Sequence, residues 1–309
     1  MGHRRMRSPY ARRRPAVLGI HGGVFEGFEL SFVDTGEATI RVRHGGSGPP
    51  LLLLHGHPQT HAMWNLGAPR LAEDFTVVAA DLRGYGESSK PPTTPDHEPY
   101  SKRALARDQV EVMRQLGFER FGVVGHDRGG RCAYRLALDH PERLEKLAVL
   151  DIVPTGDMWH RVDMEFGLVD WHWFFLAQPA PFPEEVIGSN PDGYYFHGDR
   201  SRFDPEALED YLSCVRDPET IHGMCEDYRA GATIDFELDE ADRGKRRIAC
   251  PVLALWSGRD ELGRWFDVLG VWRQWADDVR GRALDCGHFL AEEAPEETYE
   301  ELRTFFAGG

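Results

Sequence analysis

The 309-residue sequence lacks the features that define several classes of protein. No apolar run approaches the roughly 20 residues that a membrane helix requires, and the run Leu51 to Leu54 is only as long as a strand. The five cysteines are scattered and include no CxxC pair, which argues against a disulfide framework and a zinc site. We found no internal repeat and no low-complexity tract. These absences predict a cytoplasmic protein without a membrane span or a metal site.

Net positive charge is also absent, because the formal charge at pH 7 is -15. Such a chain would repel a polyanion, so we expect no nucleic acid among its partners. The first stretch, MGHRRMRSPYARRR, is basic, but it has no apolar segment of the kind found in a secretory signal. We expect residues 1–24 to form a disordered basic leader outside the fold.

Short apolar runs bounded by turn residues predict the strands of a central sheet. They lie at Leu51–His55, Thr76–Asp81, Phe121–Gly125, Leu147–Val153 and Pro251–Ser257. A hairpin at the sheet edge is expected over Phe28–Val33 and Ala38–His44, and helices over Ser101–Gly117 and Arg131–His140. Strands that alternate with helices indicate an α/β fold with a mostly parallel, twisted sheet flanked by helices. We assign residues 25–153 and 248–309 to this core.

Between residues 154 and 247 the pattern changes, because aromatic, proline and acidic residues replace the buried-strand runs. This composition predicts a mostly helical segment inserted between two core strands. A lid, or cap, over an active site is the natural role of such an insertion, since closing a site expels water. The alternative is a helical decoration without a functional part.

The segment VVGHDRGGR, from Val123 to Arg131, carries the strongest chemical signal. Its Gly-x-X-x-Gly spacing after a buried strand is that of a nucleophile elbow, the sharp strand-to-helix turn that presents residue X on a strained backbone. Here X is Asp127, and a carboxylate can act as a nucleophile that forms an ester intermediate. A turn with an ordinary surface aspartate is the alternative interpretation.

The other members of a catalytic set follow in chain order. His288, after the short strand-like ALDC, is the candidate base. The turn His55-Gly56-His57-Pro58 is the candidate oxyanion turn, in which the backbone N–H groups of His57 and Arg128 would face the ester carbonyl. Asp151 ends the strand-like LAVLD and Asp260 follows the strand-like LALWSGR, and either could orient His288.

Several motifs together resemble the haloacetate (fluoroacetate) dehalogenases of the α/β-hydrolase superfamily. They are HGHP, DLRGYGES, GHDRGGR, LDIVPT, WHWFFLAQP, CEDYRAGA and GHFLAEEAPEE. The resemblance runs from about Phe25 to the C-terminus, and the arginine directly after Asp127 distinguishes this family from haloalkane dehalogenases, which place Trp there. It implies hydrolysis of a small 2-haloacid to the 2-hydroxy acid and halide, without a cofactor.

The resemblance also implies roles for individual residues. Asp127 would be the nucleophile, His288 the base and Asp151 the acid. The pair that holds the substrate carboxylate would be Arg128 and Arg131, which lie one helical turn apart and suit a planar carboxylate. The halide would be held by His172, Trp173 and Tyr228. Salt-bridge formation by the arginines and lid packing by His172 and Trp173 are the structural alternatives.

The sequence departs from this family at three points. His57 stands where an aromatic residue is usual, the lid stretch PDGYYFHGDRSRFDP is short and lacks a halide-contacting Trp, and Asp260 adds an acid. The choice of halide and the choice between Asp151 and Asp260 therefore stay open.

Two other functions fit parts of the pattern. An epoxide hydrolase would share Asp127 but needs two lid tyrosines, for which the sequence offers Tyr194, Tyr195, Tyr211 and Tyr228. The charged Arg128 argues against a neutral epoxide. A protein that binds a small acid without turning it over is the second alternative. In each case the partners would be a small molecule and water, with a homodimer as one option for assembly.

Overall fold

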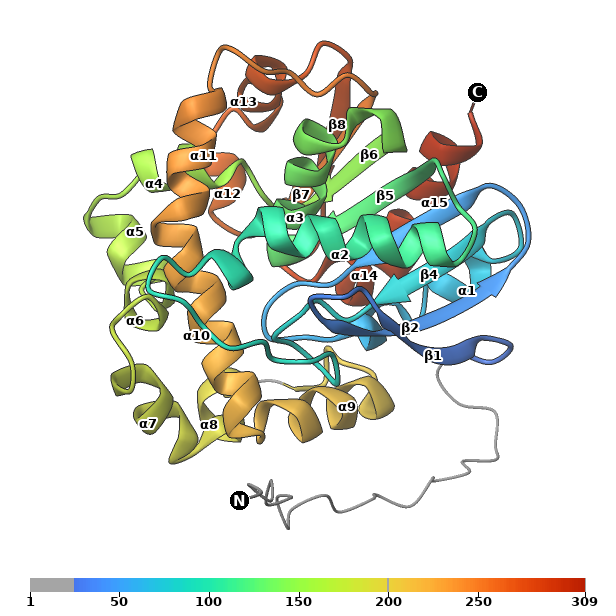
Figure 1. Cartoon of the computed structure of the whole chain (residues 1–309). Coiled ribbons are helices and arrows are strands. Elements are labelled where there is room, and N and C mark those ends of the chain that lie inside the picture. The colour runs from blue at the N-terminus through green and yellow to red at the C-terminus, as the bar shows by residue number, and fades with distance from the viewer. Residues whose placement is uncertain (1–24, 199, 309) are drawn as a thin grey trace, which may run out of the picture.

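A computed structural model describes residues 25–198 and 200–308 of the chain (Figure 1). The predicted leader, residues 1–24, lies outside the described residues. The centre is an eight-stranded sheet with the order β1-β2-β4-β3-β5-β6-β7-β8. The strands are β1 (Glu29–Asp34), β2 (Thr39–Gly46), β3 (Pro50–Leu54), β4 (Thr76–Ala80), β5 (Phe121–His126), β6 (Leu144–Leu150), β7 (Val252–Ser257) and β8 (Val279–Leu284).

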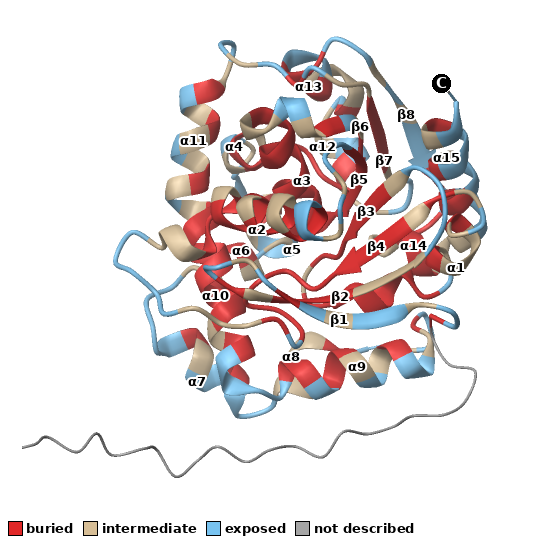
Figure 2. Ribbon diagram, turned by 45° about the vertical axis from the view of Figure 1, so that its right-hand side comes forward, coloured by how far each residue is buried: buried red, intermediate tan, exposed pale blue. Residues whose placement is uncertain are grey.

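The register of the sheet confirms the predicted α/β-hydrolase architecture. β1 and β2 form an antiparallel hairpin at one edge, and β2 is antiparallel to β4. The remaining neighbours, from β4 through β3, β5, β6 and β7 to β8, are parallel. The residues of β5 are all buried, as expected of an apolar strand that is covered on both faces. Figure 2 shows this buried centre with exposed surface on the outer helices.

Helices before β6 and after β7 flank the sheet. They are η1 (His61–Trp64), α1 (Ala68–Leu71), η2 (Glu98–Tyr100), α2 (Lys102–Gln115), α3 (Asp127–Asp139), η3 (Pro141–Arg143), α12 (Leu262–Trp265), α13 (Val268–Trp275), α14 (Leu290–Glu293) and α15 (Pro295–Ala307). α3 packs on β5, β6 and α2, so the end of β5 and the start of α3 are fixed against the core.

Between β6 and β7 the described chain is helical. It forms α4 (Thr155–His160), α5 (Met164–Val169), α6 (His172–Leu176), α7 (Phe182–Gly188), α8 (Pro191–Tyr195), α9 (Pro205–Val215), α10 (Pro218–Ala232) and α11 (Ile234–Asp242). α10 packs against α6, α7, α9 and α11 and organises the group, as its position in Figure 1 indicates. These helices fall within the predicted insertion, residues 154–247.

Three predicted elements were placed wrongly. The helix expected from Arg131 begins at Asp127, because the elbow turns directly into α3. The strand expected over Leu147–Val153 is β6, Leu144–Leu150, whose exposed Glu145 masked its start. The short strand expected at ALDC is β8, which is mostly exposed and carries arginines, so it lacks an apolar run.

No helix among the described residues is long and apolar enough to cross a membrane. In the same residues, no group of three or more His, Cys, Asp or Glu side chains is arranged to hold a metal ion. The five cysteines are all free thiols.

Candidate active site

Asp127 occupies the tight junction between β5 and α3. Its backbone is left-handed, with φ of 44°, a conformation that non-glycine residues rarely adopt and that is typical of strained functional turns. A Cβ on Gly125 would lie 2.4 Å from the carbonyl oxygen of Gly129, and a Cβ on Gly129 would lie 2.4 Å from that of His55. The two glycines therefore permit the close backbone approach that presents the Asp127 carboxylate.

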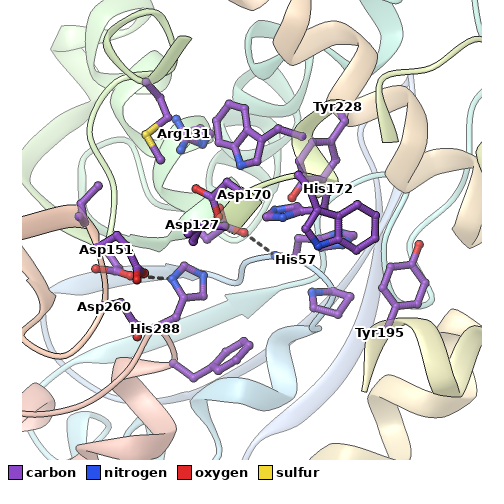
Figure 3. Close-up of a pocket in the computed structure, with 18 of the residues that line it drawn as sticks. His57, Asp127, Arg131, Asp151, Asp170, His172, Tyr195, Tyr228, Asp260 and His288 are labelled. Carbon is purple, nitrogen blue, oxygen red and sulfur yellow. Dashed lines mark hydrogen bonds and ion pairs between the residues drawn. The ribbon is translucent and has the colours of Figure 1, made fainter. Parts of the chain in front are cut away.

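His288 is joined to Asp151 rather than to Asp260. Its Nδ1 lies 2.6 Å from Oδ2 of Asp151, and the other Asp151 oxygen accepts a 2.8 Å hydrogen bond from the Ser257 N–H. No hydrogen bond of the described residues links Asp260 to His288, although Asp260 lines the same cavity. Figure 3 shows the Asp151–His288 pair on one side of Asp127.

The charges around Asp127 and His288 reinforce each other. Burial alone would raise the pKa of Asp127, but His288, Arg128 and Arg131 outweigh it and hold the pKa well below its usual range. Burial disfavours charged His288, but the hydrogen bond and charge of Asp151, together with Asp127, raise its pKa to about 9. Asp127 is therefore a carboxylate and His288 an imidazolium at neutral pH in the free protein.

The predicted oxyanion turn lies against Asp127. The His57 N–H donates a 2.9 Å hydrogen bond to Oδ2 of Asp127. The Arg128 N–H lies in the first turn of α3, where backbone amides have no partner within the helix. The structure thus brings one of the two predicted backbone donors into contact with Asp127 and leaves the other beside it.

Arg128 and Arg131 are both buried, but they differ in their surroundings. Arg128 donates from Nε to Oδ2 of Asp227 at 2.5 Å and from Nη2 to the Asp227 carbonyl oxygen at 2.7 Å, while its buried Nη1 has no partner. Arg131 donates from Nη1 to the Val153 carbonyl oxygen at 3.1 Å and to Thr155, and its buried Nε has no partner. Arg131 lines the cavity and Arg128 does not.

Two of the three predicted halide ligands, His172 and Tyr228, lie on the opposite side of Asp127 from Asp151 (Figure 3), and Trp173 packs against Tyr228. The ring centroids of His172 and Tyr228 are 5.7 Å apart, and those of Trp173 and Tyr228 are 6.0 Å apart. Burial lowers the pKa of His172 to about 4, so its imidazole is neutral and carries a single N–H. All three side chains line the cavity.

Three residues that the sequence analysis did not assign to the site also contribute to it. Asp170 lines the cavity, as does Tyr195, which the sequence analysis offered only as a lid tyrosine. Asp227 fixes Arg128, and Nε2 of His126 lies 2.8 Å from the His288 carbonyl oxygen, an acceptor for its N–H. The sequence could have indicated Asp227, a charged residue next to Tyr228 in a partly apolar helix, and His126, next to Asp127. It gave no such signal for Asp170.

The tyrosines available for ring opening also separate in the structure. Tyr194, Tyr195 and Tyr228 line the cavity, whereas Tyr211 donates a 2.9 Å hydrogen bond to Glu292 away from it. The hydroxyl of Tyr195 is buried without a partner and does not point toward Asp127 (Figure 3).

Comparison with known proteins places this site in a family. Residues 49–295 match the model of the alpha/beta hydrolase fold. The chain is 52% identical to a fluoroacetate dehalogenase of Burkholderia sp over 92% of this chain and 95% of that one. It is 32% identical to a soluble epoxide hydrolase of Corynebacterium sp. (strain C12), over 93% and 96% of the two chains.

A solved structure of an α/β hydrolase from Nostoc sp PCC 7120 superposes with a TM-score of 0.89 at 56% identity. It covers 91% of this chain and 99% of its own. The elbow with its aspartate, the sheet order and these similarities agree, and the chain belongs to the haloacetate dehalogenase family of the α/β-hydrolase superfamily.

Proposed function

We propose that this protein hydrolyses the carbon–halogen bond of a small 2-haloacid, releasing halide and the 2-hydroxy acid through an ester on Asp127. The observation that carries the proposal is the ionised Asp127 carboxylate at the elbow, in a cavity shared with the buried, incompletely paired guanidinium of Arg131. The 52% identical fluoroacetate dehalogenase supports it.

In the first step, the Asp127 carboxylate attacks the carbon that bears the halogen, and halide leaves with the electron pair of the broken bond. Arg131, which lines the cavity, holds the substrate carboxylate, and its buried Nε has no partner in the structure. Arg128, which Asp227 anchors outside the lining, adds its positive charge and an unpartnered Nη1 beside Asp127. A buried donor without a partner costs free energy, so an anion that pairs with it is bound favourably. The departing halide accepts hydrogen bonds from His172, Trp173 and Tyr228.

In the second step, His288 takes a proton from water, and the hydroxide attacks the carbonyl carbon of the Asp127 ester. The oxyanion is stabilised by the backbone N–H groups of His57 and Arg128, and its collapse releases the 2-hydroxy acid and restores the Asp127 carboxylate. Because the ester has removed the negative charge of Asp127, the pKa of His288 falls, and the base becomes available only after the first step.

The helices of residues 154–247 act in this proposal as a cap over the reacting atoms. They supply His172, Trp173 and Tyr228, and α6 and α10 hold these side chains against the core residue Asp127. Excluding water from the first step would strengthen the charge interactions that the substrate makes.

A single turnover of chloroacetate in heavy-oxygen water tests the mechanism. The label should enter Asp127 first and reach product only in later turnovers. His288→Asn should form the ester and fail to hydrolyse it, so that the protein gains the mass of the attached acid. Label in the product with none in Asp127 would mean that His288 activates water for direct attack on carbon, and the covalent route would be wrong.

Epoxide hydrolysis is the second candidate, because Tyr195 and Tyr228 both line the cavity and a 32% identical relative is a soluble epoxide hydrolase. It would need both hydroxyls near the opening ring, and Tyr195 does not point toward Asp127. Styrene oxide incubated beside fluoro-, chloro- and bromoacetate separates the functions: diol formation without halide release would favour the epoxide. Tight binding of haloacetate without halide release would instead favour a non-catalytic role.

A further inference from the structure

The side chain of His57 has no hydrogen-bond partner, although its backbone N–H contacts Asp127. The imidazole lines the cavity. Its Nδ1 is buried without a partner, and no hydrogen bond among the described residues involves its Nε2. A neutral imidazole carries its proton on one of these two nitrogens. In either tautomer, the His57 ring therefore has an N–H group without an acceptor in the protein.

The electrostatic surroundings of His57 keep its ring neutral. Burial lowers the pKa of His57 to about 3, and the neighbouring His172 and Arg128 act in the same direction. The carboxylates of Asp127 and Asp227 oppose this shift without overcoming it. The ring is therefore too weak a base to take a proton from water at neutral pH, and it has no extra proton to give. What it can offer to a substrate is a hydrogen bond from its N–H.

His57 lies beside two of the residues proposed to hold the halide. The centroid of its ring is 5.1 Å from that of Tyr228 and 6.4 Å from that of His172, whose ring is nearly parallel to it, at 7°. Figure 3 shows the three residues together, on the side of Asp127 away from Asp151. Among the described residues, no hydrogen bond involves the His172 ring or the Tyr228 hydroxyl either. The three side chains thus form a group of N–H and O–H donors that lack an acceptor.

We infer that the ring N–H of His57 is a further donor to the departing halide, and that it favours fluoride over the larger halides. This inference rests on the proposed function, because it concerns the halide that Asp127 displaces. As the new C–O bond forms, the electron pair of the carbon–halogen bond passes to the halide, and His57 donates a hydrogen bond without losing its proton. Fluoride has its charge on the smallest of the halides and accepts the strongest hydrogen bonds, so it gains most from an additional donor.

His57→Phe tests the inference. The variant keeps the backbone N–H that contacts Asp127 and a planar ring, but it lacks both ring nitrogens. Loss of one donor to a developing negative charge costs about 10²–10³ in rate, so we expect kcat/KM for fluoroacetate to fall at least about tenfold more than kcat/KM for bromoacetate. Both substrates give the same ester on Asp127, and kcat/KM includes steps only up to halide loss. A disturbed oxyanion turn would therefore not change the ratio of the two values.

Three further variants separate hydrogen bonding from shape. His57→Gln retains a side-chain N–H and should keep the fluoroacetate-to-bromoacetate ratio within about threefold of the natural one. His57→Met, with a flexible chain of similar length but no N–H, should lower the ratio as His57→Phe does, and it replaces that variant if the phenyl ring prevents folding. His44→Phe makes the same substitution on β2, outside the cavity lining, and should leave the ratio unchanged.

Four outcomes would overturn the inference. They are an unchanged ratio in His57→Phe and His57→Met, an equal fall in His57→Gln, release of chloride and bromide but not fluoride by the natural protein, and slower hydrolysis of the ester with an unchanged ratio. The second would assign the loss to the shape of the ring, and the last would assign the ring to the second step. Failure of the natural protein to release halide from any haloacetate would instead contradict the proposed function.

Discussion

The two parts of the chain that meet at the cavity are built in different ways. The α/β core contributes Asp127, Asp151 and His288 from positions that directly follow strands or lie in the loop after β8, and the first two have left-handed backbones. The segment between β6 and β7 contributes His172 and Tyr228 from helices. Strained backbone held by a packed sheet places reacting groups accurately, whereas helices packed on one another can vary the shape of a pocket.

The inserted helices and the core strands that precede Asp127 and Asp151 also differ in how far their side chains are buried. Large apolar side chains on α5 and on α7 and its neighbours face solvent, and Met164 is 82% exposed and Leu168 72% exposed. The strands that precede Asp127 and Asp151 are, in contrast, almost fully buried. We therefore expect changes in these core strands and the residues that follow them to reduce the reaction with every substrate, and changes in the inserted helices to alter which substrate is preferred.

The largest expected effect comes from the core arginines. Arg128→Ala and Arg131→Ala each remove one side of a buried charge interaction, which costs about 3–5 kcal/mol, or on the order of 10³-fold in kcat/KM. Arg128→Lys should also be damaging, because Lys lacks the planar fork through which Arg128 donates to two oxygens of Asp227. Steady-state halide release from chloroacetate measures the loss in kcat/KM. A near-normal kcat/KM in both alanine variants would mean that the arginines do not bind the carboxylate.

The next effect distinguishes the two candidate acids. Asp151→Asn should slow ester hydrolysis by about 100-fold, because an amide neither fixes the tautomer of His288 nor stabilises its charge. Asp260→Asn should change turnover by only a few-fold, since it makes no hydrogen bond to His288. Rapid-quench measurement of the ester separates the two steps. A larger loss in Asp260→Asn would reverse the assignment, and two partial losses would indicate a shared role.

The two half-reactions should respond differently to pH. Ester formation should be nearly constant from pH 5 to 8, because the pKa of Asp127 lies below its usual range and the nucleophile stays ionised. Ester hydrolysis requires neutral His288, so its rate should rise about tenfold per pH unit up to the pKa of His288 in the ester, which lies below the value of about 9 in the free protein. Single-turnover rates at several pH values test this. A hydrolysis rate that falls as the pH increases would contradict the assignment of His288 as the base.

The smallest effect is expected in the inserted helices. Tyr228→Phe removes one hydroxyl donor from the proposed halide position. It should lower kcat several-fold more for fluoroacetate than for bromoacetate, because fluoride is the poorer leaving group. The ring contacts with His172 and Trp173 are retained in this variant, so the packing of the pocket is preserved. An equal loss on the two substrates would indicate a structural role for Tyr228.

Much of the core could be predicted from the sequence because local signals agree with its tertiary structure. The run FGVVG followed by GHDRGG encodes a buried strand and a tight turn within a few residues, and it placed Asp127 correctly at the elbow. The bounds of β8 were not predicted, because its exposed arginines interrupt the apolar pattern by which a strand is recognised. The orientation of the Arg128 side chain could not be predicted, because it depends on Asp227, which is 99 residues away in sequence.

The sequence gave less information on which residues of the inserted helices line the cavity. His172, Trp173 and Tyr228 were identified through resemblance, but the entry of Asp170 into the cavity depends on how α5 and α6 pack over the core. A lone aspartate between two aromatic stretches has no local feature that distinguishes a pocket residue from a surface one. Only the three-dimensional arrangement separates these alternatives.

The salt bridge between Arg128 and Asp227 has an evolutionary consequence. Asp227 also receives hydrogen bonds from Tyr85 and Lys102, and the ring of Tyr228 lies 4.0 Å from the Arg128 guanidinium. α10 is thus bound to the core through several buried groups, and a substitution there must be compensated at more than one position at once. α5 and α8 carry no such cluster among the described residues, whereas Glu184 of α7 pairs with His222 and Arg229 of α10. Single mutations in α5 and α8 can therefore reshape the pocket one step at a time. Diversification of substrate range should therefore be concentrated in those helices, while α10 changes slowly together with α3.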